Sequence, residues 1–171
     1  MQLGKMRFNI NKADSQIIGD YQNQIERFLV AQDRLIWYDE SCQERIYDVA
    51  LAEIRAGRKQ THWIWFIFPQ IRGLGHSSRS FYYGLTKGEA KDYSNHSVLS
   101  MRLKECCNEL LKKEKGVTSV QIFGQIDARK VKSSMTLFYL VSGEKIYKDV
   151  LERFYGGELD SRTLSLLGDN E

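Results

Sequence analysis

Proline and cysteine are scarce in this chain of 171 residues, and neither sign of charge dominates. The single proline excludes a proline-rich linker or stalk. The three cysteines, Cys42, Cys106 and Cys107, are odd in number and two are adjacent, which excludes a simple disulfide framework. The 25 basic and 22 acidic residues give a net charge of +3, which lacks the basic excess of a nucleic-acid-binding protein. We therefore expect no nucleic-acid partner.

Long apolar runs and short catalytic motifs are absent as well. The longest apolar run, Trp63 to Phe68, is far shorter than the ~20 residues of a membrane-spanning helix, and residues 1–20 contain no apolar core of a signal peptide. With reduced thiols, these absences predict a cytoplasmic protein without a membrane partner. No P-loop, HExxH, CxxC or GxSxG motif occurs, and the three histidines are scattered. We expect no metal and no cofactor, and the oligomeric state stays open.

What the chain does contain is typical of a globular protein, with 42% hydrophobic and 12% aromatic residues. The apolar spacing predicts a mostly α fold: a flexible N-terminal arm over residues 1–20, then a single compact domain over residues 21–171 with about seven helices and few or no strands. Two capping boxes, Ser41–Glu44 and Thr86–Glu89, predict helix starts, and Gly57 predicts the end of the first of these helices. Trp37 and Tyr38 are predicted to lie in a loop. Further helices are expected over residues 98–114, 127–141, 144–154 and 160–166.

The segment from residue 57 to residue 84 combines aromatic, basic, histidine and glycine residues, as small-molecule pockets do. Trp63, Trp65 and Tyr83 could stack on a base or a nicotinamide ring. The more common role of such aromatics is packing in the core, and this alternative stays open. Periodicity does not decide whether Thr61 to Phe68 is a buried strand or a buried helix that Pro69 ends.

Basic residues of the same segment lie near glycines. Arg72 and Arg79 could hold phosphate oxygens, with help from backbone amides near Gly73 and Gly75. The alternative is that both arginines only lie on the surface. The segment therefore contains the residue types of a phosphate site without a motif that would identify one.

Two residues are candidates for catalysis. His62 could act as a general base, because the pKa of an unperturbed histidine lies near neutrality, although a histidine bonded to a carbonyl group is the commoner case. Asp127 begins a predicted helix, so its carboxylate could cap that helix or stabilise an oxocarbenium-like centre. We favour the cap. Lys130 and Ser134, further along this helix, could face a ligand or, for the serine, bond back to the chain.

Several motifs carry a resemblance to a known family. HWIWFIFPQ over residues 62–70, Gly73-Leu74-Gly75, and Ile122-Phe123-Gly124 followed by Asp127 resemble the domain of unknown function 1810 family, whose members are sometimes labelled "calpastatin". The resemblance implies a nearly all-helical fold, which favours a helix over residues 61–68, and it implies no established activity. The family usually has proline after His96, where this chain has Ser97, so we expect an altered helix start there. More distantly, the chain is similar to the YbiA-like family, associated with NAD and ADP-ribose metabolism and N-glycosidic bond cleavage.

Two functions follow as hypotheses. In the first, the protein binds or acts on an ADP-ribose or NAD-type nucleotide, with His62 and Asp127 serving the hydrolysis of an N-glycosidic bond. In the second, it is a non-catalytic helical module that binds a protein partner through an aromatic patch. We favour the first, which requires that the tryptophan-rich segment and the Asp127 helix meet around a shared hollow. Its ligand-binding candidates, which include two glutamines from the family motifs, are Gln32, Trp63, Trp65, Gln70, Arg72, Gly73, Gly75, Tyr83, Lys130 and Ser134.

Overall fold

The computed structural model describes residues 25–37 and 42–168. Over these residues the chain is mostly α-helical, which confirms the predicted fold class, and its two short strands form a single small sheet. Nine helices lie in the described part, more than the seven or so expected, because α4 and α5 are short helices of four and five residues. The elements are α2 (Glu26–Asp33), β1 (Leu35–Trp37), β2 (Gln43–Arg45), α3 (Ile46–Ala56), α4 (Ile64–Ile67), α5 (Ser78–Tyr82), α6 (Lys87–Asn95), α7 (Ser97–Leu111), α8 (Ser119–Ser142), α9 (Lys145–Tyr155) and α10 (Ser161–Gly168).

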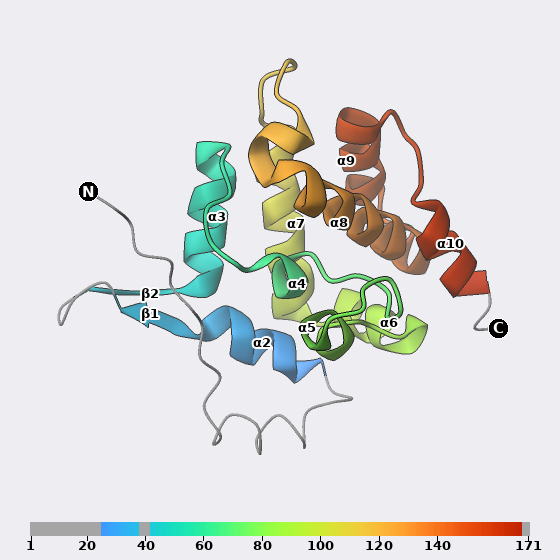
Figure 1. The fold of residues 1–171 in the computed structure, drawn as a ribbon, viewed down its shortest axis with the longest axis horizontal. Coiled ribbons are helices and arrows are strands. Elements are labelled where there is room, and N and C mark those ends of the chain that lie inside the picture. Colours follow the sequence, from blue (N-terminus) through green and yellow to red (C-terminus); the bar gives the residue numbers. More distant parts are fainter. Residues whose placement is uncertain (1–24, 38–41, 169–171) are drawn as a thin grey trace.

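Helix α8 is the centre of the fold (Figure 1). It packs against α9, α6, α10 and α4, while α7 packs against α9, α3 and α6. The helices bury one continuous apolar core, in which Phe138 of α8 lies against Tyr93 of α6 and Tyr147 of α9 at ring-centroid distances of 5.1 and 5.7 Å. Burial of apolar surface of this kind supplies most of the driving force for folding.

Short-range signals of a helix start or end are present at three helices. Gly57 adopts the left-handed conformation after α3, and its N–H reaches the carbonyls of Glu53 and Ile54. Thr86 and Glu89 form both hydrogen bonds of a capping box at α6. Asp160 accepts a hydrogen bond from the N–H of Thr163 in α10 at 2.9 Å. Each signal depends on residues no more than four positions apart, which is why the sequence alone identifies it.

The predicted capping box at Ser41–Glu44 is wrong. Ser41 lies outside the described residues, and Glu44 belongs to β2, which pairs antiparallel with β1. Helix α3 therefore begins only at Ile46, with Arg45 as its N-cap. Trp37, predicted to lie in a loop, ends β1, and Tyr38 lies outside the described residues. Pairing of β2 with the strand just before it has overridden the capping preference.

The segment from residue 61 to residue 68 forms a helix, as the family resemblance implied, but a short one. Helix α4 covers only Ile64–Ile67, and Phe68 ends it before Pro69. The residue before a proline is disfavoured in the helical region, so the chain leaves the helix there. The buried side chains of Trp63, Ile64 and Phe68 fix the turn to the core.

Asp127 does not cap a helix, which corrects the favoured interpretation of this residue. Helix α8 begins at Ser119 and is capped by Thr118, eight residues before the start predicted from Asp127. A kink interrupts the helix at Gly124, where φ is 77° and ψ is 163°. This backbone region is accessible essentially to glycine alone. Asp127 thus lies in the first turn after the kink, and its carboxylate is engaged by Lys59 of the loop before α4 and by Lys130 of the same helix.

Candidate ligand-binding site

A buried carboxylate fixes the connection between α3 and α4. Glu53 accepts hydrogen bonds from the backbone N–H of Gln60 at 2.8 Å, from the N–H of Thr61 at 3.1 Å and from Nε1 of Trp63 at 2.7 Å. Trp63 has no exposed surface. Its indole nitrogen therefore has its partner inside the protein, as buried polar groups require. The result is a rigid loop held against the core immediately before α4.

Lys59 ties the same loop to α8 on both sides of the kink. Its backbone N–H donates to the carbonyl of Ile122 at 2.7 Å, before Gly124, and its Nζ lies 2.8 Å from Oδ2 of Asp127, after Gly124. The Nζ also donates to the carbonyl of Thr61 at 2.7 Å. Only 8% of the Lys59 side chain is exposed. A lysine this buried needs its opposite charge and its hydrogen bonds to remain stable.

Asp127 lies between two ammonium groups. Its Oδ1 accepts from Nζ of Lys130 at 2.9 Å while its Oδ2 pairs with Lys59. Burial by itself raises the pKa of Asp127, but the hydrogen bonds from Lys59 and Lys130 outweigh this effect and lower the pKa below its usual value. The carboxylate is therefore ionised at neutral pH, so it has no proton to donate as a general acid.

Trp65 of α4 is partly buried, and its indole ring contacts two cationic side chains, Lys130 and Arg79. Nζ of Lys130 is 4.6 Å and Cζ of Arg79 is 5.0 Å from the indole centroid. Among the described residues, Arg79 has no carboxylate partner. We call Lys59, Trp65, Arg79, Asp127 and Lys130 the Trp65 cluster; with three cations and one anion it carries a net charge of +2. The tryptophan-rich segment and the Asp127 helix therefore do meet, but no residue of the cluster lines either of the two hollows described below.

The kink at Gly124 lies between two residues of α8 that contact the segment from residue 59 to residue 68. Just before it, the Phe123 ring packs edge-on against Trp63 and Phe68, at centroid distances of 6.3 and 5.8 Å. Just after it, Asp127 reaches Lys59. Phe123 and Asp127 are four residues apart, a spacing that places two residues on one face of a helix. Helix α8 thus places an aromatic ring in the core and a carboxylate at the cluster, one on each side of the break at Gly124.

Arg72 and Gly73 lie in a different place from the Trp65 cluster. They line a hollow of about 460 Å³ together with Phe81 of α5. Phe81 and Arg79, which contacts Trp65, are two residues apart on α5 and so project about 200° from one another. The predicted ligand-binding residues therefore lie on two sides of α5 and do not line a single hollow.

The other predicted ligand-binding residues have mainly internal surroundings. Gln32 is 1% exposed; its Nε2 donates to the carbonyl of Phe66 at 2.9 Å, and its Oε1 accepts from Arg102 at 3.1 Å. Ser134 has no exposed surface, and its hydroxyl makes no hydrogen bond to any described residue. The carbonyl of Gln70 accepts from the N–H of Leu85 at 2.9 Å. These contacts are internal to the protein, and none of them involves a residue of the Trp65 cluster.

Gly75 and Tyr83 flank α5, and His62 lies on the loop before α4. A Cβ on Gly75 would come within 2.5 Å of Ser80, so the loop approaches α5 closely. The Tyr83 ring lies between Phe28 and Phe66, and burial raises its pKa to about 12.

His62 is exposed, and no hydrogen bond or ion pair of the described residues joins it to Asp127. The two predicted catalytic residues therefore have no direct contact.

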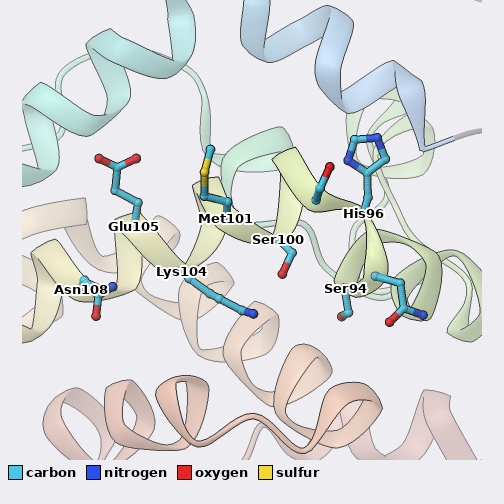
Figure 2. A pocket seen from close by; sticks show the side chains of 9 residues that line it. Ser94, His96, Ser100, Met101, Lys104, Glu105 and Asn108 are labelled. Atoms are coloured by element: carbon cyan, nitrogen blue, oxygen red, sulfur yellow. The ribbon is translucent and has the colours of Figure 1, made fainter.

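A second, wider hollow of about 650 Å³ lies along the exposed face of α7 (Figure 2). None of the predicted site residues lines it. Its charged groups are engaged: Lys104 pairs with Glu144 at 2.6 Å, and Glu105 accepts from the Tyr47 hydroxyl at 2.5 Å. Figure 2 shows Glu105 and Lys104 pointing to opposite sides of the helix, so the polar groups do not converge on one point.

Two further properties concern only the described residues. Within residues 25–37 and 42–168, no three histidine, cysteine, aspartate or glutamate side chains are placed to hold a metal ion. No helix of this part is long and apolar enough to span a membrane.

Glu53 and Lys59 are the residues that sequence reasoning missed. Glu53 shares its helix face with Val49, Ala50 and Ile54, all of which are buried. The sequence does contain a signal for Glu53, since it is an acidic residue on an otherwise apolar helix face. A carboxylate in such a position is predicted to be buried and to accept hydrogen bonds from several donors. Lys59 gave no such signal, since its partner Asp127 is far away along the chain.

The described residues form a small helical fold that carries a basic, aromatic cluster of side chains. A family model described as "Protein of unknown function (DUF1810)" matches residues 22–167, and the chain belongs to this family, which confirms the resemblance seen in the sequence. The chain is similar to the conserved hypothetical protein Rv1873 from Mycobacterium tuberculosis, whose crystal structure superposes with a TM-score of 0.76. The two are 37% identical over 85% of this chain and 97% of that chain. No curated protein matches the chain.

Proposed function

We propose that the protein binds a phosphate-bearing, nucleotide-type ligand at the Trp65 cluster. The observation that supports this proposal is the placement of Arg79 and Lys130 over a partly exposed indole ring, at 5.0 and 4.6 Å from its centroid. Guanidinium and ammonium groups bind phosphate oxygens, and an indole ring offers a base a surface for stacking. A nucleotide carries both of these groups in one molecule.

Charge supports the same ligand class. The cluster carries a net charge of +2, and a ligand with two phosphate groups would neutralise it. Stacking of a base on an aromatic side chain contributes about 1–3 kcal/mol, and a charge-assisted hydrogen bond contributes about 1.5–3 kcal/mol. A base that stacks on Trp65 would displace one of the two cations from the ring and leave it free for the phosphate groups. Binding should therefore weaken as the salt concentration rises.

Asp127 is the carboxylate that the cluster offers for N-glycosidic chemistry, but both of its oxygens are paired with lysines. It would stabilise the positive charge that develops on the sugar once the ligand's phosphate groups draw Lys130 away from it and leave one carboxylate oxygen unpaired. His62 would then act as the base that takes a proton from the attacking water. The two roles are testable separately, because no contact of the described residues links the two side chains.

A thermal-shift experiment with matched variants tests the binding proposal. ADP-ribose, NAD and AMP are added to the wild-type protein, to Arg79→Gln and Lys130→Gln, and to the control Lys148→Gln, which removes one positive charge from the exposed pair with Glu152. A ligand at 100 times its Kd raises stability by about 2.7 kcal/mol, or about 5–11 °C in a domain of this size. The proposal expects this shift in the wild-type and control proteins and its reduction in the cluster variants.

The same experiment separates the alternative, a module that binds a protein partner through exposed aromatic residues. Trp37 at the end of β1 is 60% exposed and Leu35 of the same strand is 43% exposed, which favours such a surface. This alternative predicts that none of the nucleotides shifts the melting temperature. Turnover of NAD or ADP-ribose is then measured for Asp127→Asn and His62→Ala, and turnover unchanged in both variants would remove these residues from any mechanism.

A further inference from the structure

The hollow on the far side of α5 has the features of a second binding site. It measures about 460 Å³, which lies within the range of small-molecule pockets. Its apolar surface comes from Ile71, Phe81 and Leu166, and the glycines at 73 and 88 leave room beside them. We propose that this hollow binds a small aromatic carboxylate, whose ring lies on Phe81 and whose carboxylate meets Arg72.

Arg72 is held in place and still has a nitrogen to offer. Its Nε donates to the carbonyl of Gly84 at 3.2 Å, and its Nη2 donates to Glu89 at 3.2 Å. Its Nη1 makes no hydrogen bond to any described residue, and 26% of the side chain is exposed. A guanidinium fixed by two bonds loses little entropy when it binds a third acceptor. Arg72 therefore offers a pre-positioned donor to an anion.

Phe81 provides the aromatic surface. It is 66% exposed, the most exposed phenylalanine of the described residues, and Cζ of Arg72 lies 5.4 Å from its ring centroid. An exposed phenyl ring at a hollow gains free energy when a ligand ring covers it. The juxtaposition of ring and guanidinium selects a ligand in which an aromatic group and an anionic group are close together.

The walls of the hollow are rigid. Ile71 and Leu85 form a parallel bridge, in which the N–H of Arg72 donates to the carbonyl of Leu85 at 2.8 Å. A Cβ on Gly84 would come within 2.9 Å of the Arg72 Cα, so these segments pack backbone against backbone. Because these walls are already ordered, binding does not require the protein to order any segment, which favours the binding of small ligands.

Gly88 allows the hollow to be filled without disturbing the fold. It lies within α6, and the nearest atom to an added Cβ is Oγ1 of Thr86 at 4.0 Å. Gly88→Leu therefore places a side chain in the hollow while replacing a poor helix former with a good one. Lys91→Leu adds the same side chain to an exposed position of α6 that does not line the hollow, and serves as the matched control.

The test is a titration of the whole chain with phenylacetate, followed by protein NMR, with neutral phenylacetamide as the comparison ligand. We expect phenylacetate to shift the signals of residues 71–73, 81 and 86–88. Gly88→Leu should abolish these shifts and Lys91→Leu should keep them. Arg72→Gln and Phe81→Ala should each weaken binding about tenfold or more, and phenylacetamide should bind less tightly than phenylacetate.

Three outcomes would overturn the proposal. These are the absence of shifts at millimolar phenylacetate, equal affinity for the neutral amide, and binding that survives Gly88→Leu. Arg72→Gln also removes an ion pair to Glu89, so Phe81→Ala and Gly88→Leu, which leave that pair intact, keep the test independent of folding. Because the Trp65 cluster lies on the other side of α5, Gly88→Leu should leave any shift caused by ADP-ribose unchanged.

Discussion

Replacement of Gly124 by alanine should destabilise the protein through its backbone alone. The residue has a φ of 77° and a ψ of 163°, and nothing lies within 4 Å of the position that a Cβ would take. Steric contact with neighbours is therefore excluded as a cause. A residue with a side chain held in this region costs about 1–3 kcal/mol, which in a domain of this size corresponds to a loss of about 2–12 °C in Tm.

Differential scanning calorimetry of Gly124→Ala measures this loss, with Gly88→Ala as its control. Gly88 also has open space at its Cβ position but lies in α6 without a positive φ, so alanine there should keep or raise the Tm. A Gly124→Ala protein as stable as the wild type would refute the reasoning, because it would mean that α8 can pass this point in a conformation open to other residues.

Three more substitutions have defined outcomes. Asp127→Asn should destabilise the protein at neutral pH, because the lowered pKa of Asp127 means that its ionised form stabilises the fold. The loss of unfolding free energy should be full above about pH 4–5 and shrink as the pH falls through the folded pKa. Urea unfolding of both proteins between pH 2 and 7 measures this loss. Gln32→Leu leaves the Nη1 of Arg102 and the carbonyl of Phe66 without a buried partner, which should cost about 1–3 kcal/mol in urea unfolding. His96→Ala removes the Nδ1 that accepts from the start of α7 and should lower unfolding free energy by about 1 kcal/mol, in the same assay.

Features that depend on neighbours in the sequence were predictable, and features that depend on distant partners were not. The cap at Gly57 and the box at Thr86–Glu89 involve only contacts within a helix turn, so the sequence contains all the information they need. The box at Ser41–Glu44 failed because β2 pairs with β1 in a short hairpin, a competing structure that the capping pattern by itself does not report. The described chain thus follows its helical periodicity except at this hairpin.

The candidate site shows the same division. Trp65, Lys130 and Asp127 were named from their residue types, and the structure brings them together. The role of Asp127 was misjudged because its partner Lys59 is distant in sequence, and a carboxylate at a helix start usually caps the helix. Arg72 was assigned to the same hollow, but its position across α5 depends on the direction in which that short helix presents its residues. The direction in which the side chains of α5 point is set by tertiary packing, and the periodicity of its five residues does not determine it.

The indole N–H signals of the three tryptophans give the most direct test of the Trp65 cluster. They are recorded by proton–nitrogen NMR and assigned with tryptophan-to-phenylalanine variants while ADP-ribose is added. Ligand binding at the cluster predicts that the Trp65 signal moves, while the signal of Trp63, buried and bonded to Glu53, and that of Trp37 stay in place. A Trp65 signal that does not move at saturating nucleotide, or a shift of Trp37 alone, would contradict the assignment of a nucleotide site to this surface.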